Sequence, residues 1–282
     1  MPETIASTAL QDGTVASRVN YIGQMSERPR YYARDSSRDV ISFDRRTILI
    51  EDARLRADPP SLGREGFALF PHTSAVGNFL NHEELAGIYL PEIERLVMEV
   101  SGADQVVISG PVILRSSERL PGASQLNILR PARFAHIDVS ESTVAQITER
   151  RRPKDISRAV HRFAHYNVWR ALSPPPQDIP LAVCDARTVS RSDLVDADSI
   201  TDIPGEPVSS IVIALVRYSA LHRWSYFSDM NRDEVLVFKT HDSDPGQPHH
   251  VPHSAFTDPS CRRGIATRES IETRTIAFWM ES

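Results

Sequence analysis

A histidine and an aspartate, His136 and Asp138, stand two residues apart in the segment from Phe134 to Ser140. The β-branched and polar texture of this segment predicts a strand. Side chains two apart in a strand point to one face, so an imidazole and a carboxylate would lie together. They could supply two ligands of a 2-His-1-carboxylate facial triad, which holds Fe(II) with open positions for oxygen and a chelating cosubstrate. The third ligand must then be a distant histidine.

The pair is weak evidence by itself, because the chain has 10 histidines and 37 acidic residues and such pairs arise by chance. A second one, His82 and Glu84, stands at the start of a predicted helix, where residues two apart diverge by roughly 200° and cannot share a metal. A hydrogen-bonded structural pair remains the alternative for His136 and Asp138.

Candidates for the third ligand crowd the segment from Thr240 to Phe256. It contains four histidines: His241, His249, His250 and His253. His249 and His253 have the spacing of a helical zinc pair, but the two prolines between Gln247 and His253 disfavour a helix. His253 precedes an apolar pair and is the preferred ligand. A solvated polar loop remains open for the other three histidines.

An arginine-rich strand follows these histidines. Arg268, Ser270, Glu272 and Arg274 would share one face of it. A guanidinium fork with a hydroxyl two residues away suits a bidentate grip on a carboxylate, such as the distal acid of 2-oxoglutarate. The alternative is a surface strand on which Glu272 pairs with an arginine.

The elements that must position these residues are mainly strands. After Gly102 the chain breaks into short β-branched runs bounded by Gly, Pro or Ser, which favours an antiparallel barrel or jelly roll. We expect a further strand over 46–55, one or two helices over 81–102 that Pro91 breaks or kinks, and a helix over 154–166. We expect a single domain over 1–282, in which 1–100 is an N-terminal extension with helices packed on a barrel core of 101–282.

Composition excludes several classes of function. A net charge of −5 with interspersed signs predicts no nucleic acid and no membrane as partner. No targeting segment or apolar run of membrane-spanning length is present, and the two cysteines are read as reduced thiols, so we expect a cytoplasmic protein. The glycine-rich nucleotide loops and the G-x-S-x-G motif are absent.

Longer strings carry a resemblance to a known family. The runs NVWRALSPPPQDIPLAVCDARTVSRSDLVDAD, RWSYFSDMNRDEVLVFKTHDSD, PHSAFTDP and TRESIETR look like the CmcJ/AsaB/NvfI-type hydroxylases and desaturases of secondary metabolism, over roughly residue 20 to the C-terminus. The resemblance implies a mainly β fold (α+β), a double-stranded β-helix (jelly roll, cupin-like) with flanking helices. It also implies a dioxygenase that uses Fe(II) and 2-oxoglutarate.

The same resemblance assigns roles to particular residues. It supports His136, Asp138 and His253 as the iron ligands, and Arg268 with Ser270 as the clamp on 2-oxoglutarate. The gap between His253 and Arg268 is longer than in more familiar relatives, so Arg274 stays open as the carboxylate partner. Further residues are candidates for the pocket: Asn167, Trp169, Arg170, Arg217, Tyr218, His222, Trp224 and Tyr226.

The implied reaction couples decarboxylation of 2-oxoglutarate to succinate with removal of hydrogen from a substrate C–H bond, followed by hydroxylation, desaturation or cyclisation. One alternative is a cupin-type metal-dependent hydrolase or isomerase without 2-oxoglutarate. Another is a non-catalytic ligand-binding jelly roll. The sequence leaves open whether the substrate is an amino acid or a larger natural-product intermediate, and it leaves the oligomeric state open.

Overall fold

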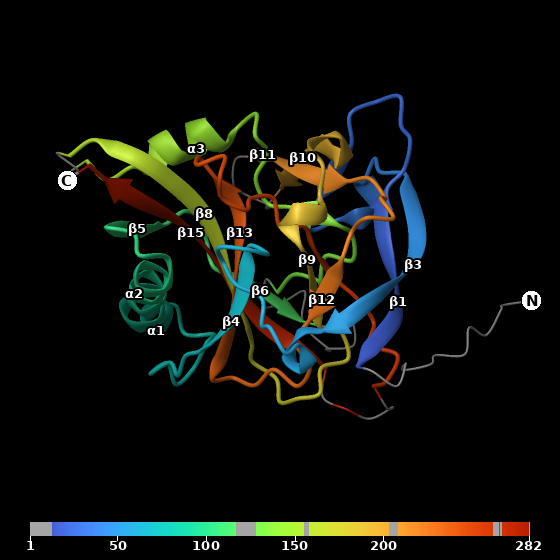
Figure 1. The fold of residues 1–282 in the computed structure, drawn as a ribbon, viewed down its shortest axis with the longest axis horizontal. Helices are drawn as coiled ribbons and strands as arrows, with labels where there is room; N and C mark the ends of the chain where they lie inside the picture. Colours follow the sequence, from blue (N-terminus) through green and yellow to red (C-terminus); the bar gives the residue numbers. More distant parts are fainter. Residues whose placement is uncertain are drawn as a thin grey trace, which may run out of the picture.

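Two β-sheets form most of the molecule (Figure 1). The computed structural model describes residues 13–116, 128–154, 158–202, 208–261, 265 and 267–281. The larger sheet contains, in order across it, β1 (Thr14–Ile22), β3 (Phe43–Asp52), β12 (Trp224–Tyr226), β9 (Leu181–Cys184), β14 (His253–Ala255), β7 (His136–Ile137), β11 (Ser209–Val216), β10 (Leu194–Thr201) and β2 (Arg30–Tyr32). The smaller sheet contains β4 (Phe67–Pro71), β13 (Glu234–Asp242), β8 (Val160–Ala171), β15 (Glu269–Met280) and β5 (Gln105–Ile108), and β6 (Ile113–Ser116) also pairs with β15.

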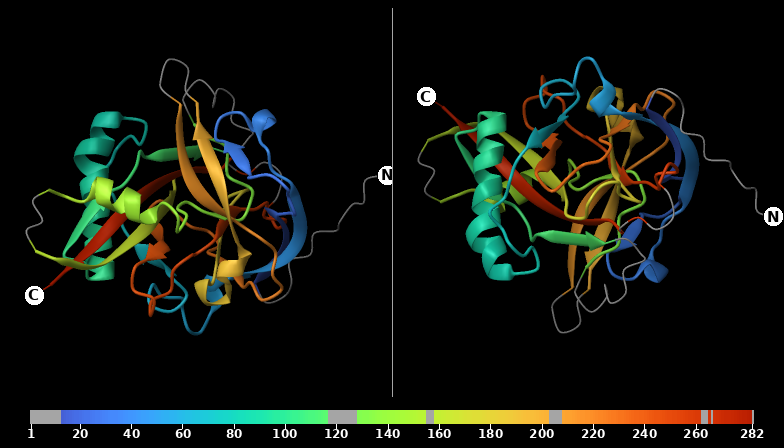
Figure 2. Two further views of the ribbon diagram at one scale, coloured as in Figure 1. Left: turned by 90° about the horizontal axis from the view of Figure 1, so that it is seen from above. Right: turned by 90° about the horizontal axis from the view of Figure 1, so that it is seen from below.

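The expectation of a mainly β chain with few helices is confirmed. The strand expected over 46–55 is β3, and the β-branched runs after Gly102 form strands of both sheets. One of these runs, at 124–130, lies mostly outside the described residues. The first hundred residues contribute strands to both sheets, because β1, β2 and β3 belong to the larger one and β4 pairs with β13. The views from above and below show β1 and β3, in blue, at one side of the molecule (Figure 2).

The helical segment over 81–102 is interrupted as its proline predicted. A short α1 (His82–Glu84) leads through a π-helical turn (Leu85–Tyr89) into α2 (Leu90–Ser101), with Pro91 in the first turn of α2. The Asn81 side chain caps the start by accepting from the backbone N–H groups of the first turn. Gly102 ends the helix at φ 70°, a left-handed conformation that glycine adopts without steric cost.

The helix expected over 154–166 is wrong for the residues that the structure describes there. The only helix nearby in the described chain is α3 (Val144–Arg151), and β8 begins at Val160. β8 pairs with β13 on one side and β15 on the other. The apolar residues Val160, Phe163 and Ala164 stand at helical spacing, but the segment is a strand because it pairs with two neighbouring strands. Its side chains are buried from Ala164 onward, whereas residues 160–163 are partly or fully exposed.

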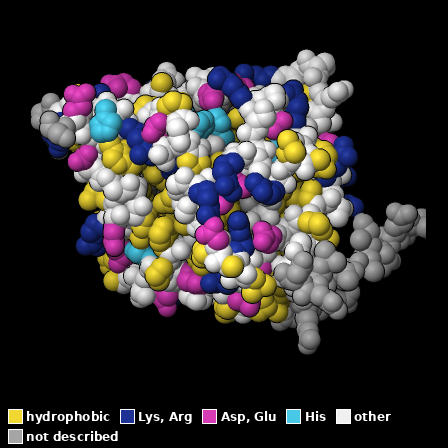
Figure 3. All heavy atoms as spheres, viewed as in Figure 1, with side chains coloured by type: hydrophobic (Ala, Val, Ile, Leu, Met, Phe, Trp, Pro, Cys, Tyr) yellow, Lys and Arg dark blue, Asp and Glu magenta, His cyan; other side chains and the backbone are white. Residues whose placement is uncertain are grey.

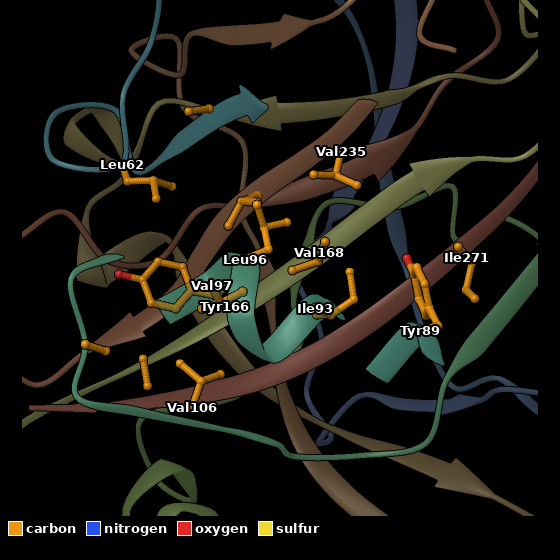
Figure 4. Close-up of a cluster of buried hydrophobic side chains, with 14 of the residues drawn as sticks. Leu62, Tyr89, Ile93, Leu96, Val97, Val106, Tyr166, Val168, Val235 and Ile271 are labelled. Carbon is orange, nitrogen blue, oxygen red and sulfur yellow. The ribbon is translucent and has the colours of Figure 1, made fainter. Parts of the chain in front are cut away.

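Two hydrophobic clusters cover the two faces of the smaller sheet. On the outer face, α2 packs its apolar side against the strands (Figure 4): this cluster includes Ile93, Leu96, Val97, Tyr166, Val168, Val235 and Ile271. Each such side chain contributes roughly 1.5–3 kcal/mol on burial. On the inner face, Trp169 and Phe238 pack against Leu181 and Val183 of the larger sheet. The inner faces of the two sheets therefore meet, and side chains from both can converge.

The surface carries no segregated charge on the face seen in Figure 3, where acidic and basic side chains are interspersed. This agrees with the absence of charge blocks in the sequence. Among the described residues, no helix has the length and apolar character needed to cross a membrane.

Candidate metal and cosubstrate site

Three side chains that stand far apart in the chain meet between the two sheets. His136 of β7 lies directly across from His253 of β14 in the antiparallel ladder, and the centroids of their rings are 4.2 Å apart. Asp138 follows just beyond β7. Its Oδ1 lies 3.9 Å from Nε2 of His136, and its Oδ2 lies 3.4 Å from Nε2 of His253. All three are buried, and one ligand atom from each lies within 4.8 Å of the others.

His136 is prepared to offer a lone pair on the side that faces Asp138. Nδ1 of His136 lies 2.9 Å from the carbonyl oxygen of Phe134, which can only accept, so Nδ1 carries the proton and Nε2 is free. Burial and the neighbouring His253 lower the pKa of His136 to about 3. The imidazole is therefore neutral near pH 7, as metal binding requires. Phe238 of β13 packs 4.8 Å from the ring of His253, centroid to centroid.

The carboxylate of Asp138 is held from the smaller sheet. Asn167 of β8 donates its amide to Oδ2, and Arg274 of β15 donates to Oδ1. Burial alone would favour the neutral acid, but Arg274 and His253 keep the pKa of Asp138 well below its usual range. Partners of this kind orient a ligating carboxylate and fix its charge. The donor set, with two imidazole nitrogens and one carboxylate oxygen on one side, fits a facial-triad metal such as Fe(II).

Arg274 is thus engaged with acidic side chains of the protein itself. Besides Asp138, its Nη2 lies 3.4 Å from Oε1 of Glu272, which is 4% exposed. Although burial opposes it, the two carboxylates raise the pKa of Arg274 above its ordinary value. The strand is not at the surface, since Ser270 and Glu272 are both buried, but Glu272 does pair with an arginine, as the alternative had it.

Arg268 has a different environment. It is 1% exposed, and its Nε and Nη2 donate to Oγ of Ser270 at 3.2 and 2.9 Å while Nη1 donates to the carbonyl oxygen of Ile179 at 2.9 Å. Its guanidinium carbon lies 5.0 Å from the centroid of the Trp169 ring. No carboxylate among the described residues forms an ion pair with it. Burial, with a smaller contribution from Arg115, lowers the pKa of Arg268 to about 9.

A cavity of about 700 Å³ opens beside the candidate metal ligands His136 and Asp138. His136, Asp138 and Arg274 line it, and most of the remaining lining is apolar. The apolar part includes Tyr31, Leu80, Pro111, Val112, Ile113, Leu114, Leu129, Ala132, Phe134, Ile211 and Ile213. Arg34, His82 and Arg115 add basic groups. The walls come from β2, β6, β11 and the segment before α1, which the sequence did not connect with the site.

Most of the other sequence-based pocket candidates lie away from this site. Arg170 points to the outer face of the smaller sheet, where it donates to the carbonyl oxygen of His72. Trp224 and Tyr226 belong to the core around β1 and β3, together with Tyr21, whose ring stacks on His222. Of the three candidates in the NVWR string, Asn167 reaches Asp138 and Trp169 packs under Arg268. His249 and His250 do not join His253 but group with Glu141.

Comparison with known proteins places the chain in a family. A family model described as "Oxidoreductase/YMDC permease-like domain" matches residues 19–278. The hydroxylase/desaturase efuI of Hormonema carpetanum is 30% identical over 294 residues, which cover 97% of this chain and 98% of efuI. The hydroxylase/desaturase asaB of Aspergillus flavus is 32% identical over 209 residues, which cover 67% of this chain and 89% of asaB.

Two further comparisons concern one relative. The Fe(II)/2-oxoglutarate-dependent dioxygenase nvfI of Aspergillus novofumigatus is 29% identical over 238 residues, which cover 82% of each chain. A solved structure of the iron and alpha-ketoglutarate-dependent endoperoxidase NvfI superimposes with a TM-score of 0.79 at 25% identity, over 95% of this chain and 99% of that one. The resemblance stated from the sequence strings is confirmed: this chain belongs to the oxidoreductase family that includes the hydroxylase/desaturases efuI and asaB and the Fe(II)/2-oxoglutarate-dependent dioxygenase nvfI.

Proposed function

We propose that this chain oxidises a C–H bond of a natural-product intermediate, with Fe(II) as its metal and 2-oxoglutarate as its cosubstrate. The observation that carries the proposal is the buried group of two histidines and one aspartate, held by Asn167 and Arg274 beside an apolar cavity. In the overall reaction oxygen and 2-oxoglutarate are consumed, and succinate, carbon dioxide and the oxidised substrate are released.

His136, Asp138 and His253 are the proposed ligands. Bound Fe(II) supplies the oxidising chemistry by activating oxygen. The protein holds the His136 tautomer through the carbonyl group of Phe134 and keeps Asp138 ionised through Arg274. Phe238 and the inner-face core exclude water from one side of the group.

Arg268 and Ser270 are the proposed partners of the distal carboxylate of 2-oxoglutarate. Arg274 already pairs with Asp138, whereas Arg268 is a buried cation without an ion-paired carboxylate among the described residues. On β8, Asn167 contacts the proposed metal ligand Asp138, and Trp169 contacts Arg268. Asn167 and Trp169 are two residues apart in the strand and are therefore separated by about 7 Å. This separation is of the same order as the length of a five-carbon diacid.

The cavity favours a mainly apolar substrate of drug-like size. Its volume of about 700 Å³ falls in the range of small-molecule sites, and its walls are largely aliphatic and aromatic. A free amino acid would place its charged groups against these walls at a desolvation cost. A larger natural-product intermediate, with one polar group near Arg34 or Arg115, fits better.

For the fold, we propose one oxygenase domain over 1–282 with double-stranded β-helix topology. The pairing of N-terminal strands within both sheets supports one domain, and the convergence of side chains from both inner faces supports the barrel-like topology.

Anaerobic titration tests the proposal. Fe(II)-loaded protein is titrated with 2-oxoglutarate while the weak visible absorption of the metal chelate is followed, and succinate release is measured after oxygen is admitted. Wild type should give both signals, and His253→Ala should give neither. A matched control, His161→Ala, changes an exposed histidine of β8 and should behave as wild type. Correctly folded, iron-loaded wild type that gives neither absorption nor succinate would instead support a metal-dependent hydrolase or isomerase.

A further inference from the structure

A second group of side chains that could bind a metal stands on the two chain segments that supply the proposed iron ligands. Glu141 stands in the turn between β7 and α3, and His249 and His250 stand in the loop between β13 and β14. One ligand atom from each lies within 4.8 Å of the others. Nε2 of His250 is 3.3 Å from Oε1 of Glu141, and the two imidazole rings are 4.5 Å apart. The proposed oxidation uses none of these residues.

The hydrogen bonds around this group leave its ligand atoms available. Nδ1 of His249 lies 2.8 Å from the carbonyl oxygen of Gln247, so Nδ1 carries the proton and Nε2 keeps its lone pair. Arg191 lies 2.5 Å from Oε2 of Glu141, which holds the carboxylate and leaves Oε1 facing His250. This is the arrangement that fixes ligands in metal sites, where the other atom of each ligand has a partner of its own.

Two features of His250, its unpartnered Nε2 and its backbone conformation, are not explained by a role in packing alone. It is 8% exposed, and its Nε2 has no hydrogen-bond partner among the described residues although Glu141 is close. Its backbone adopts φ +66°, a left-handed conformation that is sterically unfavourable for a side chain with a Cβ. Buried polar atoms without partners and strained backbones are both uncommon, and together they mark functional sites.

The surrounding charges do not exclude a cation. Arg64 and Arg187 line the adjoining cavity of about 530 Å³, but both are already paired with acidic residues. The partners of these two arginines are Asp58, Glu65 and Asp185. Arg191 is the remaining arginine of the lining, and it pairs with Glu141 itself.

We propose that Glu141, His249 and His250 bind a second divalent metal ion, with Zn²⁺ as the preferred ion. Two imidazole nitrogens and one carboxylate oxygen form a donor set typical of zinc, with water in the fourth position. Glu141 stands three residues after Asp138, and His250 stands three residues before His253. The ion would therefore join the same two segments that supply the three proposed iron ligands, and would hold them in register.

Zinc binding in a protein without the iron site tests this proposal. In the His136→Ala/His253→Ala variant, equilibrium dialysis against Zn²⁺ alone should give one bound equivalent and an increase in Tm. Adding His250→Ala or Glu141→Gln should weaken this binding at least tenfold and remove the increase in Tm. Adding His161→Ala, which changes an exposed histidine, should leave both unchanged.

Two results would overturn the second site. One is a folded background variant that binds no zinc. The other is zinc binding that persists in both the His250→Ala and the Glu141→Gln variants, which would place the ion elsewhere. If the background variant does not fold, the count is made in wild type, where two equivalents should fall to one in His250→Ala. Each readout is independent of 2-oxoglutarate turnover, so failure of the second site and failure of the proposed oxidation are distinguishable.

Discussion

Replacing Arg268 by methionine should separate a cosubstrate clamp from a structural arginine. The side chain is buried without an ion-paired carboxylate among the described residues, and burial lowers its pKa to about 9. One pKa unit corresponds to about 1.4 kcal/mol, so holding the charge in this place costs the metal-free protein about 5 kcal/mol. In the proposed role, the carboxylate of 2-oxoglutarate offsets this cost when it binds to Arg268.

The expected changes have opposite signs for stability and binding. Methionine removes the buried charge, which raises the free energy of unfolding. It also removes the hydrogen bonds to Ser270 and to the carbonyl oxygen of Ile179, and this loss offsets about 3 kcal/mol of that increase. The free energy of unfolding without ligand should therefore rise by roughly 1–2 kcal/mol. Two charge-assisted hydrogen bonds to the cosubstrate are lost at about 1.5–3 kcal/mol each, so the Kd for 2-oxoglutarate should rise at least ~100-fold.

Urea unfolding of the metal-free protein and calorimetric titration of the Fe(II)-loaded protein with 2-oxoglutarate measure the two effects. Arg170→Met is the matched control, because Arg170 is equally buried but lies on the outer face of the sheet, where it donates to the carbonyl oxygens of His72 and Arg232. It should destabilise the protein and leave the Kd for 2-oxoglutarate unchanged. The reasoning is refuted if Arg268→Met destabilises the protein by more than about 2 kcal/mol while 2-oxoglutarate binds as in wild type.

Three further predictions concern the metal, acid stability and the cavity. Asn167→Ala removes a donor to Asp138, so the Kd for Fe(II) should rise about 10–100-fold in dialysis with unchanged circular dichroism; an unchanged Kd would mean that Asn167 does not orient the ligand. Burial lowers the pKa of His165 to about 3. As the pH drops from about 6.5 toward 3, His165 is therefore protonated in the unfolded state but not in the folded state. The free energy of unfolding should fall over this range by up to about 1.4 kcal/mol per pH unit. Urea midpoints of the metal-free protein at pH 7 and pH 5 should show a smaller difference in His165→Gln than in wild type, and equal differences would contradict the assignment. Ile211→Trp fills the cavity wall, so substrate-stimulated succinate release should fall about tenfold with an unchanged Kd for 2-oxoglutarate; full activity would place the substrate elsewhere.

Local pattern was enough for most strands and failed for the first half of β8. β3, β13 and β15 have β-branched runs that stand out in the sequence, and the Asn81 cap and Gly102 end of the helical segment also follow from local chemistry. The first half of β8 was predicted as a helix, because its apolar residues Val160, Phe163 and Ala164 stand at helical spacing. Only pairing with β13 and β15 decides its conformation.

Part of the candidate site could also be predicted from local sequence. The two-residue spacing that places His136 and Asp138 on one face, and Arg268 with Ser270 on another strand, is a property of the extended backbone and is visible in the sequence. The long strings that mark the family are visible there as well, and the comparisons confirm them.

What only the tertiary structure decided is which distant groups meet. The contact of Asn167 and Arg274 with Asp138, the different surroundings of Arg268 and Arg274, and the apolar cavity all join segments separated by many residues. Sequence spacing carries no information about such contacts, because they depend on how two sheets face each other. The sequence by itself determined the chemistry that is available, and the packing of the sheets decided which side chains are brought together to perform it.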